Sequence, residues 1–132
     1  MFVLLLISSV YISIVDLANH KISNRTLIIV GTGFSVITAI VNGQLYLFSA
    51  LATFFLGLLA ASFGLGAGDV KLATLLALFF LPLEISKWSE LCIGFLIVGV
   101  LLLLSHLISR KSMAEPIALA PAICAAFIWC AR

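Results

Sequence analysis

Long apolar runs alternate with short polar links along the whole chain. The apolar runs cover roughly residues 2–16, 27–41, 45–63, 70–81, 91–108 and 117–131. A membrane-spanning helix needs about 20 mostly apolar residues, and the shorter runs reach that length through their flanks or end in a wet cavity. The pattern predicts an all-α, polytopic membrane helix bundle with about six transmembrane segments. Four or five spans fit the same pattern.

Composition favours a membrane protein over a soluble one. The chain of 132 residues is 64% hydrophobic and 9% charged, whereas soluble domains carry about 25% charged residues. We therefore expect one transmembrane domain over residues 1–132, surrounded by lipid. The first apolar run lacks the preceding basic residue that a signal peptide normally carries, so we expect a retained helix.

Several classes of partner are disfavoured by the same composition. The net charge is only +2 and no basic run is interleaved with aromatic residues, so nucleic acid is not an expected partner. The cysteines Cys92, Cys124 and Cys130 form no CxxC pair and no Cys/His cluster. Neither a metal nor another cofactor is therefore expected.

Basic residues are distributed unevenly over the links. With six spans the links alternate between the two sides of the membrane. One side then receives Lys21, Arg25, Lys71, Arg110 and Lys111, and the other receives Lys87 and Arg132. Because basic residues are enriched in cytoplasmic links, the N-terminus is predicted to lie outside.

Two of the five acidic residues stand at unusual places. Glu84, Glu90 and Glu115 lie in polar links and are interpreted as solvated. Asp16 and Asp69 instead lie where an apolar run meets a cytoplasmic link, at the same predicted membrane depth. Ionisable groups at the edge of a span are costly and usually functional.

Paired carboxylates have a specific chemistry. Two carboxyl groups a few ångströms apart share one proton, because like charges resist double ionisation. The ionised group can take a proton from water while the protonated group donates to the carbonyl under attack. Asp16 and Asp69 are therefore the predicted catalytic residues of a peptide hydrolysis that needs no metal.

The glycine-rich stretch GLGAGDVK, residues 64–71, fits this interpretation. Its glycines can adopt backbone angles closed to other residues, so one helix can end there and Asp69 can begin the next, where amides favour a carboxylate. Gly57, Ala61, Gly64 and Gly68 recur about one turn apart, which predicts close helix packing. Lys71 fits either a snorkelling surface lysine or a residue that supports the motif.

These motifs resemble the type IV prepilin peptidases, which are membrane aspartic proteases with a GxGD motif. The resemblance lies in Asp16 with the following HKISNRT, in GAGDVKLA at residues 66–73, and in PIALAPAI at residues 116–123. The small size is similar to the short members that serve Flp or tight-adherence pili. Agreement extends over nearly the full chain.

The resemblance implies a multi-pass enzyme of the bacterial inner membrane. It would cleave the leader from prepilins or pseudopilins at the cytoplasmic face, for pilus assembly or secretion. Asp16 and Asp69 would be the catalytic pair, and Lys21, Asn24, Gly66, Gly68 and Lys71 would bind substrate or support the motif. No cofactor is implied.

The sequence departs from the family pattern at two places. Ser23 stands where proline is usual, which weakens the expected rigidity of that loop but not the chemistry. The cysteine-rich region linked with N-methylation in larger members has no counterpart here, so methyl transfer is not expected. Because a basic leader is repelled by the basic links, recognition is expected to rest on the apolar helix of the substrate.

Rival interpretations come from other classes. Presenilin-type proteases share the GxGD aspartate, but their chains are much longer. A small transporter or proton-pathway subunit would use Asp16 and Asp69 as ion sites, although such sites belong near the bilayer midplane. A structural assembly subunit, or a homo-oligomer of this chain, is compatible with the small-residue packing pattern.

Overall fold

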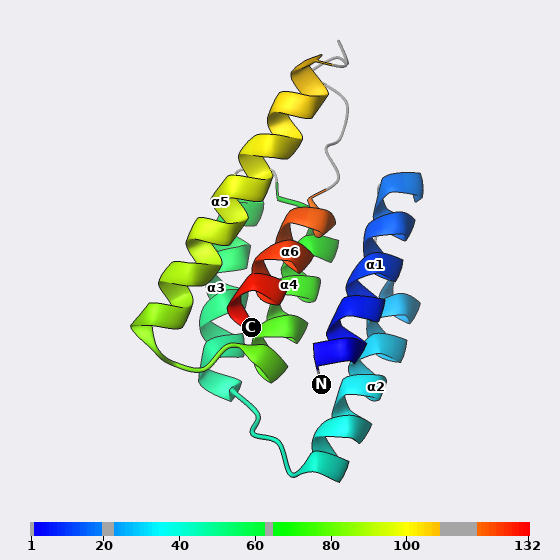
Figure 1. Cartoon of the computed structure of the whole chain (residues 1–132), viewed down its shortest axis with the longest axis vertical. Coiled ribbons are helices and arrows are strands. Elements are labelled where there is room, and N and C mark those ends of the chain that lie inside the picture. Colours follow the sequence, from blue (N-terminus) through cyan, green and yellow to red (C-terminus); the bar gives the residue numbers. More distant parts are fainter. Residues whose placement is uncertain (1, 20–22, 63–64, 109–118) are drawn as a thin grey trace.

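The computed structural model describes residues 2–19, 23–62, 65–108 and 119–132, and these form six α-helices without a strand. The helices are α1 (Phe2–Asn19), α2 (Asn24–Val41), α3 (Leu47–Ser62), α4 (Ala67–Phe80), α5 (Ile85–Ile108) and α6 (Ala120–Cys130) (Figure 1). The all-α prediction is confirmed, and each predicted apolar run corresponds to one helix.

The two central helices are α4 and α6, which pack against each other. On one side of this pair α1 packs against α6 and α2 packs against α4, and on the other side α3 packs against α4 and α5 against α6. Within the described residues α3 and α5 do not contact each other. The best buried core residues include Leu5, Phe34, Leu72, Leu76 and Phe127.

Local signals explain where two of the helices begin and end. The Ser23 hydroxyl accepts a hydrogen bond from the Thr26 amide at 3.2 Å and caps α2. α2 ends at Asn42, whose φ of 51° is left-handed, followed by Gly43. α4 ends at Phe80 with Leu81 as its C-cap, because the following Pro82 cannot continue a helix.

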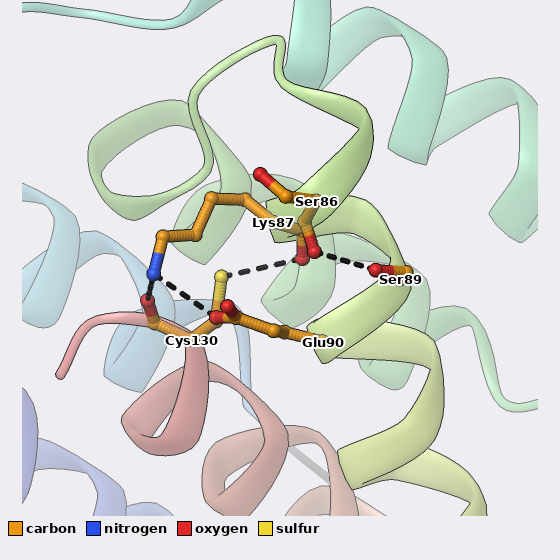
Figure 2. A network of polar contacts seen from close by, with 5 residues as sticks. All are labelled: Ser86, Lys87, Ser89, Glu90 and Cys130. Carbon is orange, nitrogen blue, oxygen red and sulfur yellow. Dashed lines mark hydrogen bonds and ion pairs between the residues drawn. The ribbon is translucent and has the colours of Figure 1, made fainter.

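The start of α5 differs from the sequence prediction. A polar link was expected to reach Glu90, but the helix begins at Ile85. Lys87 Nζ donates to Glu90 Oε2 at 3.0 Å and to the carbonyl oxygen of Cys130 at 3.2 Å, and the Cys130 thiol donates to the Lys87 carbonyl at 3.5 Å (Figure 2). The contact between Lys87 and Glu90 pairs two opposite charges within one helical turn. The contacts with Cys130 join the start of α5 to the end of α6.

Much of the apolar surface faces outward. Two helical stretches are long and apolar enough to cross a membrane, Asn24–Val41 and Ile85–Ser105, and shorter apolar helices cover Phe2–Ala18, Leu47–Ser62 and Ala120–Cys130. Large side chains such as Ile29 and Phe48 are more than two-thirds exposed, at 72% and 76%. Apolar surface of this extent is typical of contact with lipid or protein partners, and the number of spans stays a prediction.

Candidate active site

The two aspartates identified from the sequence lie at the same end of the bundle. Asp16 is in the last turn of α1, and Asp69 is in the first turn of α4. The start of α6 lies at this end as well, whereas both chain termini point to the other end (Figure 1). The sequence placed Asp16 at the end of the first helix, but α1 continues to Asn19, so the carboxylate projects from within the helix.

Asp16 is buried, with 4% of its surface exposed, and is bound to the start of a distant helix. Its Oδ2 accepts a hydrogen bond of 3.1 Å from the backbone amide of Ala120, the first residue of α6. α6 has no side-chain cap of its own and carries Pro121 near its start. Asp16 therefore supplies the missing cap from α1, at the positive end of the α6 dipole.

Asp69 is held in a similar way by its own helix. α4 begins at Gly66, which has no side chain to act as a cap. The Asp69 carboxylate instead accepts a hydrogen bond from the Gly66 backbone, and the Asp69 amide donates to the Gly66 carbonyl at 3.0 Å. Gly68 lies in the same first turn. This arrangement is half of a capping box.

Because Gly66 has no side chain, the Asp69 carboxylate can lie against its backbone. A Cβ built on Gly66 would lie 2.9 Å from Asp69 Oδ2, which is closer than a Cβ normally lies to another atom. A larger residue at this position would therefore require the Asp69 carboxylate or the backbone to shift. Gly64, the first glycine of the stretch, lies outside the described residues.

The two carboxylates form an electrostatic pair. The negative charges of Asp16 and Asp69 interact with each other, and the Cys124 thiol of α6 lies near both of them and near the hydroxyl groups of Ser9 and Ser13. Two like charges in partly buried surroundings resist double ionisation. A pair in which one carboxyl group is ionised and the other protonated can abstract one proton and donate another in the same reaction.

Comparison with known proteins identifies the family of the chain. The model of the type IV leader peptidase family matches residues 3–130, which include both aspartates. The chain belongs to the type IV leader peptidase family. Searches of the curated proteins and of the solved structures found no match. Membership confirms the resemblance seen in the motifs and makes the chain a member of a peptidase family.

In this type IV leader peptidase family member, two further motif residues contact each other. Lys71 Nζ donates to Asn24 Oδ1 at 3.0 Å and so joins the first turn of α2 to the first turns of α4. Both side chains are exposed. Lys21, the third polar residue assigned to the motif, lies outside the described residues. The sequence had named Lys71 and Asn24 separately, without pairing them.

Sequence reasoning missed two contributors to the site of this family member. One is the amide of Ala120, for which Pro121 in the early position of a helix was the available signal. The other is Ser23, interpreted only as a lost proline. Its hydroxyl caps α2. A proline side chain has no group that could do so. The serine therefore fixes the start of α2 by a hydrogen bond.

Proposed function

We propose that this protein is a membrane aspartic endopeptidase that cleaves the leader peptide of type IV prepilins or pseudopilins, with Asp16 and Asp69 as its catalytic pair. One observation carries the proposal. In a chain of a peptidase family, two carboxylates separated by 53 positions lie at the same end of the bundle, each bound to the backbone at a helix start. Their charges interact, as a shared-proton mechanism requires.

The reaction follows from the pair. The ionised carboxylate takes a proton from water, whose oxygen then bonds to the scissile carbonyl carbon, and the protonated carboxyl group gives its proton to the carbonyl oxygen. The tetrahedral diol collapses when its C–N bond breaks, and the leaving nitrogen takes a proton from the pair. Water is consumed, one acid and one amine are formed, and the pair returns to its starting state.

The membrane setting is part of the proposal. We place the protein in the bacterial inner membrane with six spans, an outer N-terminus and the site at the cytoplasmic face. Among the described residues, Arg25 and Lys71 lie at the site end, whereas Lys87 and Arg132 lie at the other end. This distribution favours the cytoplasm at the site end. Methyl transfer is not part of the proposed activity.

The test is replacement of each aspartate by asparagine. Asp16→Asn and Asp69→Asn each keep the shape of the side chain and an oxygen that accepts the same backbone hydrogen bond, so the protein should insert and accumulate. Neither amide can accept the proton from water. Loss of a general base typically lowers the rate by about 10²–10⁴-fold, and more when two groups act as a unit. Processing of a co-expressed prepilin, followed by its mobility shift, is expected to stop.

Glu84→Gln is the matched control, because Glu84 is an exposed acid at the opposite end of the bundle, and it should process normally. Full processing by one asparagine variant at equal enzyme level would remove that residue from the mechanism. Normal processing by both would end the aspartic mechanism and favour a transporter that uses the same two residues.

A further inference from the structure

An apolar groove lies between α3 and α5. It has a volume of about 240 Å³, its floor is formed by α4 and α6, and its lining contains no charged side chain. The α3 wall consists of Thr53, Leu56, Gly57 and Ala60, which recur at the spacing of one helix face. The groove exists because α3 packs only on α4 and α5 only on α6 within the described residues.

The opposite wall has the same periodicity. Trp88, Leu91, Cys92 and Phe95 of α5 line the groove at positions i, i+3, i+4 and i+7, which form one stripe of a helix. In a packed bundle such a stripe faces another helix. Two facing stripes that do not touch therefore leave a space suited to a further apolar helix, since in lipid an inserted segment must satisfy its own backbone as a helix.

The groove ends beside the start of α4. Its lining includes Leu65, which precedes Gly66, and Val70, which follows Asp69, and neither aspartate lines it. A helix seated in the groove therefore places the chain at its end beside the turn that carries Asp69. A lipid or a second copy of this chain in the groove would have no need for an end of the groove beside Asp69.

A second open groove, between α2 and α4, fits a basic leader less well. Its lining includes Lys71 and Asn24, so a positively charged leader entering there would meet the charge of Lys71. The described lining of the α3–α5 groove presents no such charge. Charge thus favours the α3–α5 groove for a substrate with a basic leader.

We propose that the α3–α5 groove seats the apolar helix of the substrate, with the leader end of that helix at Gly66 and Asp69. The inference rests on the proposed peptidase function and assigns its substrate-binding surface. Cys92 is a native probe of it, because this thiol is exposed in the groove whereas Cys124 and Cys130 are buried.

The first experiment is disulfide cross-linking in membranes. The intact protein is expressed with a prepilin substrate that carries one cysteine, moved residue by residue along its apolar helix. Cross-links to Cys92 are expected at substrate positions three or four residues apart, and Cys92→Ser should abolish them. A substrate that instead cross-links to Thr32→Cys in the α2–α4 groove, in a Cys92→Ser background, would overturn the proposal.

The second experiment fills the groove. Cys92→Trp should lower kcat/KM for prepilin by about tenfold or more, because the indole occupies the seat of the substrate. Leu96→Trp is the control: Leu96 lies one turn along α5, is 62% exposed and does not line the groove. Equal cleavage by both variants would overturn the groove assignment.

The two levels of the proposal fail differently. If both aspartate variants lose activity while Cys92→Trp processes normally, the peptidase stands and the groove is wrong. A substrate that is neither cleaved nor cross-linked by the intact protein, or a Cys92–Cys92 dimer in place of a substrate adduct, would overturn the groove as a substrate seat.

Discussion

At position 66, the absence of a side chain and the place of the Asp69 carboxylate depend on each other. The Asp69 carboxylate occupies the space in which any Cβ at Gly66 would lie, 2.9 Å from Oδ2. An added methyl group has two outcomes, movement of the carboxylate or opening of the first turn of α4. Both shift the Asp69 carboxylate from the place it has in the structure.

Gly66→Ala should therefore lower activity without preventing insertion. A misplacement of about 1 Å can reduce a rate by about 10²-fold, and we expect a loss of that order in kcat measured on a purified prepilin. Gly99→Ala is the matched control, because a Cβ on Gly99 meets nothing within 4 Å. An active Gly66→Ala enzyme would show that the Asp69 carboxylate works from a different place.

At this scale the sequence identified residues better than contacts. Asp16, Asp69, Gly66, Asn24 and Lys71 were predicted as site residues because their motif spacing is short and distinctive. Their partners were not, because the bond from Asp16 to the Ala120 amide joins positions 104 apart and that from Lys71 to Asn24 joins positions 47 apart. Residues so far apart in the sequence are brought into contact only by the packing of helices, which a local sequence pattern does not predict.

At the scale of the elements, α3 and α4 meet at a glycine. A Cβ on Gly57 would lie 2.6 Å from Val70 Cγ1, so the two helices approach more closely than alanine allows. Gly57 is one of the small residues that the sequence assigned to packing, and the structure places it in that role. Because Val70 follows Asp69, the α3–α4 contact also supports the site.

Gly57→Ala should destabilise the protein by about 1–3 kcal/mol, as overpacking of a tight contact does. The measurement is thermal unfolding in detergent. Val70→Ala alone leaves a cavity and is destabilising too, but the double variant should lose less stability than the sum of the single losses, because the new methyl group fills the vacated space. Additive losses would contradict direct contact between these two positions.

Element boundaries were predictable where a breaker or a cap stands in the sequence. Asn42 and Gly43 end α2 and Pro82 follows α4 as the pattern indicated. The start of α5 was not predictable, because residues 84–90 appear polar while the ion pair of Lys87 with Glu90 and the bond from Lys87 to α6 make a helical turn favourable there.

At the scale of the whole molecule, the distribution of charge leads to a prediction of topology. Arg25 lies at the site end and Gly43 is an exposed residue at the other end. In a Cys92→Ser background, Gly43→Cys should react with an impermeant thiol reagent in intact cells, and Arg25→Cys should react only after the membrane is opened. The reverse pattern would place the site outside.

The length of α4 has a consequence for how water reaches the site. This helix has 14 residues between its two caps, which gives about 21 Å of rise, whereas the hydrocarbon core of a bilayer is about 30 Å thick. In the proposed topology α4 lies among the other helices, so it ends within the depth of the bilayer, where a water-filled recess in the protein is tolerated. Such a recess would bring the second reactant of hydrolysis down to the level of the aspartates.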